Sequence, residues 1–199
     1  MSGHEQAPKA LGAVILAAGD SSRMGQPKAL LDRGGETFLG HWLRILQEAK
    51  IKEIRVVLGR DATLIQKAVD LSQRQVVIQR FPEEGMLSSL CLGLGRLPEE
   101  LAGCFLCPVD HPVIQVSLLN RMQAALLPGS VVIPEHAGRR GHPVLFAAEL
   151  FQELHDAPLT GGARTVVRAD PQRVITVEAD AGVLADIDTP DDFKKLDQA

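Results

Sequence analysis

Several short segments of this chain are apolar at nearly every position, instead of at every second position. Three examples are the segments 13–17, 104–107 and 131–133. A β-strand with one face in water alternates apolar and polar residues, so a strand that is apolar throughout needs cover on both faces. Segments with helical spacing separate these runs. The sequence therefore predicts an α/β fold, in which a single doubly wound, mostly parallel sheet carries helices on both faces.

The expected strands and helices alternate along the chain. We expect strands at 13–17, 54–58, 76–78, 104–109, 131–133, 144–146 and 174–177. We expect helices at 37–49, 61–71, 88–97, 115–127, near 151, at 162–169 and at 190–196, with Thr37 and Asp61 as N-caps of the first two. Gly93 and Gly95 weaken the prediction of the third helix, because glycine has a low helix propensity.

The length and the charge of the chain narrow its class. With 199 residues we expect one domain over 11–199, preceded by a disordered tail over 1–10. The first ten residues are polar and lack the apolar core of a signal peptide, and no segment has 18 consecutive apolar residues, so we expect a cytoplasmic protein without a membrane span. The formal charge of −4 argues against a nucleic-acid partner.

Two of the three cysteines form a C-x-x-C pattern inside an apolar run. Cys104 and Cys107 lie three residues apart in an expected strand, so they point to opposite faces of the sheet and are too far apart for a disulfide. We expect buried, inert thiols, and weigh redox or metal chemistry as the alternative.

Ligands of doubly wound sheets bind at the carboxyl ends of the strands. Functional residues should therefore follow strands, which selects the segments 19–28 and 85–89, Asp110, and the acidic stretch 186–192. A carboxylate such as Asp110 at a strand end is a natural Mg²⁺ ligand, and the alternative is a turn acceptor or a helix cap.

The loop after the first strand is the most informative segment. Residues 16–28 read L-A-A-G-D-S-S-R-M-G-Q-P-K, with small residues at the turn and two cations, Arg23 and Lys28. Small residues let backbone N–H groups approach a phosphate, and the two cations suit a polyphosphate. The spacing fits neither a Walker A motif nor the G-x-G-x-x-G fingerprint of dehydrogenases. The alternative is a loop whose cations face water.

This loop resembles the signature of the MobA-like nucleotidyltransferase family, of which molybdenum cofactor cytidylyltransferases are members. The family pattern L-A-[AG]-G-x-S-x-R-M-G-x-x-K is matched by Leu16, Ala17, Ala18, Gly19, Ser21, Arg23, Met24, Gly25 and Lys28. The A-A-G form of the loop resembles the cytidylyl-transferring members. The resemblance therefore favours CTP as the nucleotide.

The resemblance continues along residues 11–195. The segment 85–90 (G-M-L-S-S-L) resembles the family's base- and ribose-contacting element, and 108–112 (P-V-D-H-P) resembles its metal-holding strand end. The segment 141–144 (G-H-P-V) looks like the element near the acceptor site, 161–164 resembles a shortened G-x-x-G-A-R stretch, and 187–190 (I-D-T-P) resembles the closing element.

The resemblance implies transfer of a nucleoside monophosphate, CMP from CTP, to a phosphate-bearing acceptor with release of pyrophosphate. It implies molybdopterin or the molybdenum cofactor as the acceptor, Mg²⁺ as the cofactor, and allows a molybdoenzyme as a protein partner. The implied catalytic residues are Arg23, Lys28 and Asp110, and the implied metal ligands are Asp110 and Asp188, with Asp186 as an alternate. The implied nucleotide-binding residues are Ala17, Ala18, Gly19, Arg23, Lys28, Gly85, Ser88 and Ser89, and the implied acceptor-binding residues are Arg140 and His142.

Simpler interpretations stay open for several of these residues. Asp188 could cap the helix at 190, although Thr189 is better placed, and Ser88 or Ser89 could cap the helix that they open. The segment 139–142 could be a solvated hairpin tip. Two other functions also stay open: a sugar- or alcohol-phosphate nucleotidylyltransferase, and a nucleotide-binding regulatory module without turnover.

Overall fold

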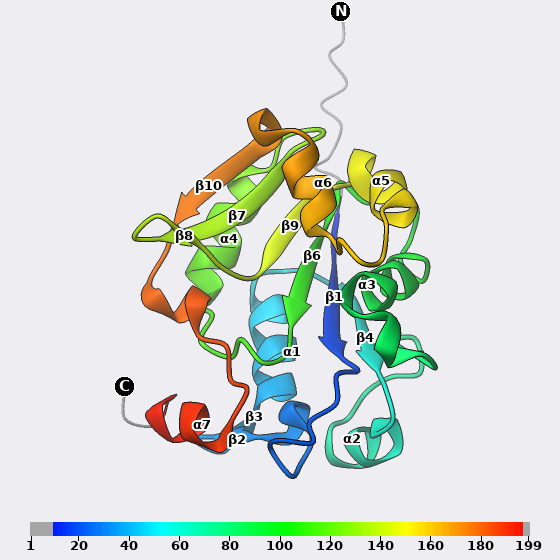
Figure 1. The fold of residues 1–199 in the computed structure, drawn as a ribbon, viewed down its shortest axis with the longest axis vertical. Helices are drawn as coiled ribbons and strands as arrows, with labels where there is room; N and C mark the ends of the chain where they lie inside the picture. The colour runs from blue at the N-terminus through cyan, green and yellow to red at the C-terminus, as the bar shows by residue number, and fades with distance from the viewer. Residues whose placement is uncertain (1–9, 197–199) are drawn as a thin grey trace, which may run out of the picture.

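The computed structural model describes residues 10–196, so all but the last residue of the expected tail over 1–10 lies outside the described residues. A mixed sheet with the order β10-β7-β9-β6-β1-β4-β5 forms the centre of the molecule (Figure 1). Its strands are β1 (Leu11–Ala17), β4 (Glu53–Leu58), β5 (Val76–Ile78), β6 (Gly103–Pro108), β7 (Val131–His136), β9 (Val144–Ala147) and β10 (Val174–Glu178). Within this path only β9 runs antiparallel to its neighbours, and the two-residue strand β8 (Arg139–Arg140) pairs antiparallel with β7. The mostly parallel α/β fold is confirmed.

Helices cover both faces of the sheet. Helices α1 (Phe38–Glu48) and α4 (Val116–Ala125) pack on one face, and α3 (Met86–Leu94), α5 (Phe151–Asp156) and α6 (Arg164–Ala169) pack on the other. Helix α2 (Ala62–Ala68) follows β4, and α7 (Pro190–Leu196) lies at the end of the molecule where β1, β4 and β6 point (Figure 1). None of the helices in residues 10–196 is long and apolar enough to cross a membrane.

The two faces of each strand supply two separate cores. In β1, Ala13 and Ile15 belong to the core with α1 and α4, whereas Val14 belongs to the core with α3. In β6, Cys107 belongs to the core with α1 and α4, and Cys104 belongs to the core with α3. Both thiols are buried and free. The prediction that these cysteines face opposite sides of the sheet is confirmed. A strand buried on both faces has no exposed position for a polar residue, which explains the continuous apolar runs.

Helix α1 begins where the sequence predicts. The Thr37 hydroxyl oxygen accepts the N–H of Gly40 at 3.0 Å, which satisfies one of the unpaired donors of the first turn. A short hairpin that the sequence analysis did not predict, β2 (Asp32–Arg33) with β3 (Glu36–Thr37), leads into this helix. Its turn consists of Gly34 and Gly35, both with positive φ.

Helix α3 differs from the prediction, because it begins at Met86 rather than at Ser88. Ser88 and Ser89 therefore lie inside the helix and do not cap it. Gly93, which weakened the helix prediction, has a packing role: a Cβ atom there would lie 2.4 Å from a methyl of Val14, so glycine lets α3 lie close against β1.

Two predictions at helix ends were partly wrong. Helix α2 ends at Ala68 instead of near Leu71, because Val69 adopts extended backbone angles. Asp61 stands at its N-cap position, but its side chain makes no capping hydrogen bond. Short 3-10 turns occupy Lys28–Leu30, Pro82–Glu84, Ala148–Leu150, Pro171–Arg173 and Ala181–Leu184.

Candidate active site

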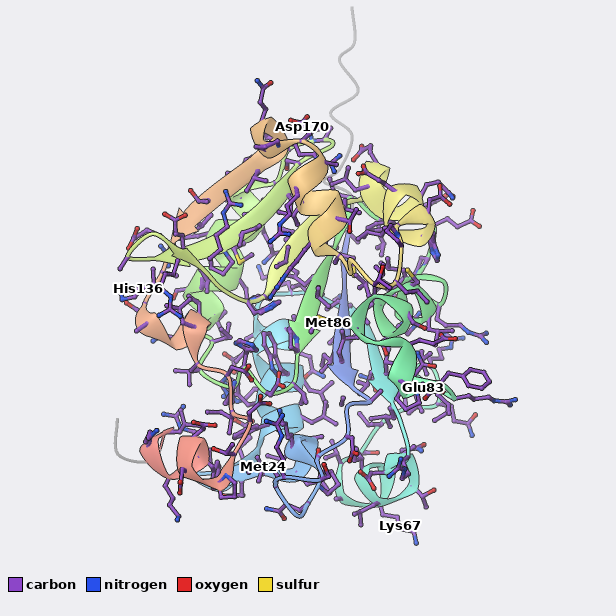
Figure 2. All side chains as sticks on the ribbon, in the orientation of Figure 1. Met24, Lys67, Glu83, Met86, His136 and Asp170 are labelled. Carbon is purple, nitrogen blue, oxygen red and sulfur yellow. The ribbon has the colours of Figure 1, made fainter. Side chains whose placement is uncertain are left out.

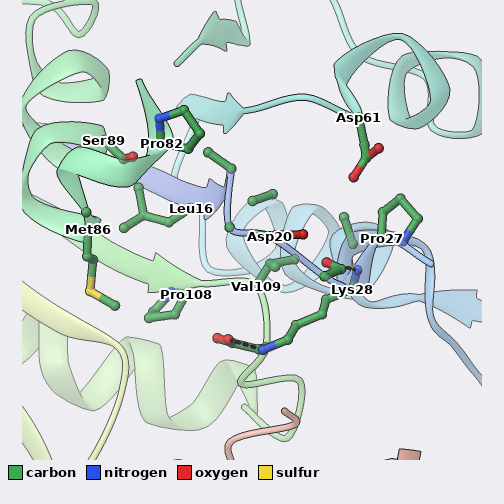
Figure 3. Close-up of a pocket in the computed structure, with 17 residues that line it drawn as sticks. Leu16, Asp20, Pro27, Lys28, Asp61, Pro82, Met86, Ser89, Pro108 and Val109 are labelled. Carbon is green, nitrogen blue, oxygen red and sulfur yellow. Dashed lines mark hydrogen bonds and ion pairs between the residues drawn. The ribbon is translucent and has the colours of Figure 1, made fainter. Parts of the chain in front are cut away.

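A cavity of about 220 Å³ opens at the carboxyl end of the sheet. Its walls are the end of β1 with the loop that follows, the N-terminal end of α3, and the end of β6 (Figure 3). The side chain of Met86 lies on the α3 wall and is half exposed (Figures 2 and 3). Drug-sized pockets usually measure about 300–1,000 Å³, so this cavity suits a group of about the size of a nucleobase, with the rest of a nucleotide outside it.

The loop after β1 keeps its shape through its own hydrogen bonds. The Ser21 hydroxyl accepts the backbone N–H of Lys28 at 3.1 Å, and the Asp20 carboxylate accepts the N–H of Ser22 at 3.0 Å. Gly59, at the end of β4, lets the loop lie close, since a Cβ atom there would be 2.6 Å from the Ala18 carbonyl oxygen. The loop is therefore pressed against the neighbouring strand end, and small residues at both positions allow that approach.

The ammonium group of Lys28 joins two carboxylates from distant segments. Its Nζ atom lies 2.9 Å from Asp110 Oδ2 and 2.5 Å from Asp188 Oδ1. Burial alone would lower the pKa of Lys28, but the hydrogen bonds and charges of Asp188 and Asp110 outweigh burial and raise this pKa. Arg23 approaches the other oxygen of Asp188 at 3.2 Å. The bond from Lys28, with help from Arg23, lowers the pKa of Asp188, so this carboxylate stays ionised.

Asp188 is available for this ion cluster because Thr189 caps helix α7. The N–H and hydroxyl of Thr189 donate to Asp192 Oδ2 at 2.9 and 2.7 Å, and the N–H of Asp192 donates back to the Thr189 hydroxyl at 3.3 Å. This reciprocal arrangement is a capping box. Of the two interpretations of Asp188, the helix cap is therefore excluded.

A third carboxylate lies beside the cluster. Asp110, His111 and Asp186 each offer one ligand atom, and these atoms lie within 4.8 Å of one another. Burial, together with the charges of Asp110 and Asp188, raises the pKa of Asp186. Asp110, Asp186 and Asp188 together concentrate negative charge here, which is the condition under which a divalent cation binds.

Two imidazole rings pack behind the carboxylates. The ring centroids of His111 and His142 are 4.7 Å apart, and the Nδ1 atoms of both are buried without a hydrogen-bond partner among the described residues. Burial, and next the neighbouring His111, lower the pKa of His142 to about 4 against the opposing charge of Asp110. His142 is therefore neutral at neutral pH, so it can bind an acceptor by a hydrogen bond but adds no positive charge.

The structure brings together most of the predicted site residues. Those that line the cavity are Ala17, Ala18, Gly19, Lys28, Gly85, Ser89 and Asp110. Asp188 and Arg23 join them through the ion cluster. Two predicted residues lie elsewhere: Ser88 is turned to the side of β5 and donates to Glu84, and Arg140 is exposed in the β7–β8 hairpin opposite Glu135.

Sequence reasoning missed three residues at this site. Asp61 and Pro82 line the cavity, and buried Gln79 binds both serines of α3. Met86 also lines the cavity and lies in the segment 85–89 that the sequence selected. Gln79 directly follows β5 and Asp61 comes shortly after β4. The rule that functional residues follow strands extends to both, because each lies within three residues of a strand end.

Comparisons with known proteins show the family of this chain. A family model described as the MobA-like NTP transferase domain matches residues 13–174. The chain is 27% identical to the molybdenum cofactor cytidylyltransferase of Escherichia coli, over 92% of this chain and 94% of that protein. It is 28% identical to a probable molybdenum cofactor guanylyltransferase of Mycobacterium avium, over 95% and 96%.

A solved structure shares nearly the whole fold. The crystal structure of Rv0371c from Mycobacterium tuberculosis superposes with a TM-score of 0.87 at 28% identity, covering 96% of this chain and 99% of that one. A structure of Rv0371c in complex with manganese gives a TM-score of 0.80 at 26% identity, over 97% and 100%. The chain therefore belongs to the family of MobA-like NTP transferase domains and is by class a nucleotidyltransferase.

Proposed function

We propose that this chain transfers CMP from CTP to a phosphate of a molybdopterin-type acceptor and releases pyrophosphate. The observation that carries this proposal is the convergence of Lys28, Asp110 and Asp188 on one point beside the cavity. These residues come from three distant segments, and their charges suit a nucleoside triphosphate with a divalent cation. The likeness to the cytidylyltransferase of Escherichia coli and the A-A-G form of the loop support CTP and the molybdopterin acceptor.

The residues present fit a divalent cation. Asp110 and Asp188 already direct one oxygen each at the same positive group, and hard carboxylate oxygens are the ligands that Mg²⁺ and Mn²⁺ take. We propose that these two residues hold Mg²⁺, with Asp186 beside them as the alternate ligand. When bound, Mg²⁺ supplies neutralisation of the negative charge that develops on the phosphate oxygens.

The protein's own groups position the reacting atoms. An oxygen of the acceptor phosphate attacks the α-phosphorus in line, the bond from phosphorus to the bridging oxygen breaks, and pyrophosphate leaves with that electron pair. When the ammonium group of Lys28 leaves Asp110 and Asp188, it neutralises the charge of the α-phosphate. Exposed Arg23 holds the β- and γ-phosphates. An acceptor phosphate is already ionised at neutral pH, so the reaction needs no strong general base.

On the acceptor side we propose His142 and Arg140. The neutral ring of His142 packs against His111, the residue after Asp110, and its buried Nδ1 has no partner within residues 10–196. Arg140 belongs to the same turn and its exposed guanidinium can supply the positive charge that His142 lacks. A molybdoenzyme that takes up the product stays a prediction.

Thermal stabilisation by the four nucleoside triphosphates tests the donor. We expect CTP with Mg²⁺ to raise the melting temperature most, because at equal ligand concentration the stabilisation grows with the logarithm of the affinity for the folded protein. Repeating the series without metal and with Mn²⁺ tests the cation. A preference for GTP would favour guanylyl transfer, the reaction named for the relative from Mycobacterium avium.

Pyrophosphate release with candidate acceptors tests the reaction itself. Release with CTP only when molybdopterin is present supports the proposal. Release with a sugar phosphate or an alcohol phosphate instead would assign the chain to the related nucleotidylyltransferases. Binding without release from any acceptor would indicate a regulatory module.

A further inference from the structure

Gln79 connects the end of β5 to the first turn of α3 through a buried amide. The side chain is 3% exposed, and its Nε2 atom lies 3.0 Å from Ser88 Oγ and 3.3 Å from Ser89 Oγ. Its Oε1 atom accepts the backbone N–H of Phe81 at 3.0 Å. A backbone N–H can only donate, so this bond determines which end of the amide carries oxygen and which carries nitrogen. The NH₂ group of Gln79 must therefore face the serines.

That orientation has different consequences for the two hydroxyl groups. Each serine oxygen accepts a hydrogen bond from Gln79, so each hydroxyl proton has to find another acceptor. Ser88 donates its proton to Glu84 Oε2 at 2.7 Å. Ser89 is 5% exposed and lines the cavity, and the described part of the chain offers its proton no hydrogen-bond acceptor. The hydroxyl of Ser89 therefore presents a donor to a ligand in the cavity.

We propose that Gln79 is a positioning residue for nucleotide recognition: it makes the Ser89 hydroxyl a donor, so that the cavity selects a nucleobase that presents a lone pair there. This inference rests on the proposed function and deepens it. In cytosine the lone pairs of O2 and N3 match this donor, but uracil also carries O2, so only a contact at N3 separates these two bases. At that edge uracil carries an N–H donor at N3 and guanine carries one at N1, and such a donor facing Ser89 would leave two hydrogens in conflict.

Dissociation constants for CTP, GTP, UTP, ATP and inorganic tripolyphosphate test the inference in four proteins: wild type, Ser89→Ala, Gln79→Met and the double variant. Loss of one neutral hydrogen bond should weaken the preferred nucleotide about fivefold in each single variant and bring its affinity closer to those of the other three. Tripolyphosphate has no base, so its affinity should stay at the wild-type value in all four proteins.

The double variant separates positioning from a general structural role. If Gln79 acts through Ser89, Gln79→Met should cause no further loss of discrimination in the Ser89→Ala background. Gln79→Glu provides a matched comparison, since it keeps an oxygen for the Phe81 N–H but replaces the donor facing the serines. It should weaken the preferred nucleotide at least as much as Gln79→Met. Glu84→Gln, which keeps an acceptor for Ser88, should match the wild type.

Analogues of the preferred nucleotide identify the contacted atom. If CTP is preferred, Ser89→Ala should cost less affinity for 3-deaza-CTP if N3 is the partner, or for 2-thio-CTP if O2 is the partner. A smaller cost for 2′-deoxy-CTP alone would place the contact on the ribose and overturn the assignment to the base.

Three results would overturn the inference. One is unchanged discrimination among the four nucleotides in Ser89→Ala. Another is an equal loss of affinity for all nucleotides and for tripolyphosphate, which would indicate a damaged loop. The last is a wild type that does not discriminate at all. If any of these results is found while the wild type still binds CTP and releases pyrophosphate, the role proposed for Gln79 and Ser89 fails and the proposed function stands. If it binds none of the nucleotides, the proposed function fails as well.

Discussion

Two clusters of opposite charges in this molecule differ in how they are built. Arg44 on α1 binds Glu36 through two bonds of 2.9 Å and Glu48 through one of 3.0 Å, over sequence separations of 8 and 4 residues. Lys28 binds Asp110 and Asp188 over separations of 82 and 160 residues. The Arg44 side chain is 47% exposed, whereas the Lys28 side chain is 13% exposed.

This difference in sequence separation and exposure helps to distinguish charged groups that act in a binding site from charged groups that only face water. The Arg44 cluster forms within one short segment and in water, where ion pairs contribute little. The Lys28 cluster gathers like charges from separate segments in a shielded place, which costs free energy unless a cation is present. Proteins accumulate such unfavourable charge mainly where a substrate or a cation is bound.

The largest effect should follow from Asp110→Asn, which tests whether the shielded cluster is catalytic. We expect the rate of nucleotidyl transfer to fall by at least about 100-fold, because the variant removes one of the two carboxylates that we propose hold the divalent cation. Pyrophosphate release measures the rate, and circular dichroism checks the fold. Activity near that of the wild type in a folded variant would remove Asp110 from the reaction.

Lys28→Ala should separate the two roles of the ammonium group. We expect kcat to fall more than nucleotide affinity. We also expect the protein without metal to lose on the order of 1–3 kcal/mol of stability, because Asp110 and Asp188 then lack the cation between them and only exposed Arg23 stays paired with Asp188. Mn²⁺ should restore much of this loss. A variant whose melting temperature responds to Mn²⁺ no more than that of the wild type would contradict this view of the cluster.

His142 should make stability fall at acidic pH. Its pKa is about 4 in the folded protein and near 6.5 when unfolded, so between these values the unfolded chain binds more protons. The contribution of neutral His142 to the free energy of unfolding is complete above pH 6.5 and is lost as the pH falls through 4. It amounts to about 3 kcal/mol, since one pKa unit corresponds to about 1.4 kcal/mol. His142→Phe keeps a ring against His111 and should flatten the stability profile measured by urea denaturation at several pH values.

Arg44→Ala should have the smallest effect. We expect a change below about 1 kcal/mol in the free energy of unfolding and no change in kcat, because the pairs that it removes are exposed. Urea denaturation at low and high salt measures both the loss and its screening. A loss as large as that of Lys28→Ala would show that exposure does not distinguish the two clusters.

Local pattern was sufficient for much of the fold. The apolar runs in β1 and β6 predicted a sheet covered on both faces, because a strand without polar positions cannot face water. The same alternation of side-chain direction placed Cys104 and Cys107 on opposite faces. The predicted start of α3 was wrong, because the 3-10 turn at 82–84 and Gly85, whose φ is positive, directly precede a helix that begins at Met86, two residues earlier than expected.

In the candidate site, too, the sequence was sufficient for some features and the tertiary structure was needed for others. The residue spacing of the segment 16–28 was sufficient to predict a phosphate-binding loop, because such a turn needs small residues and cations close together in the chain. The partners of Lys28 and the neutrality of His142 depend on groups that are distant in sequence. Burial and hydrogen bonding between such groups exist only after the chain has packed, so the tertiary structure alone decided them.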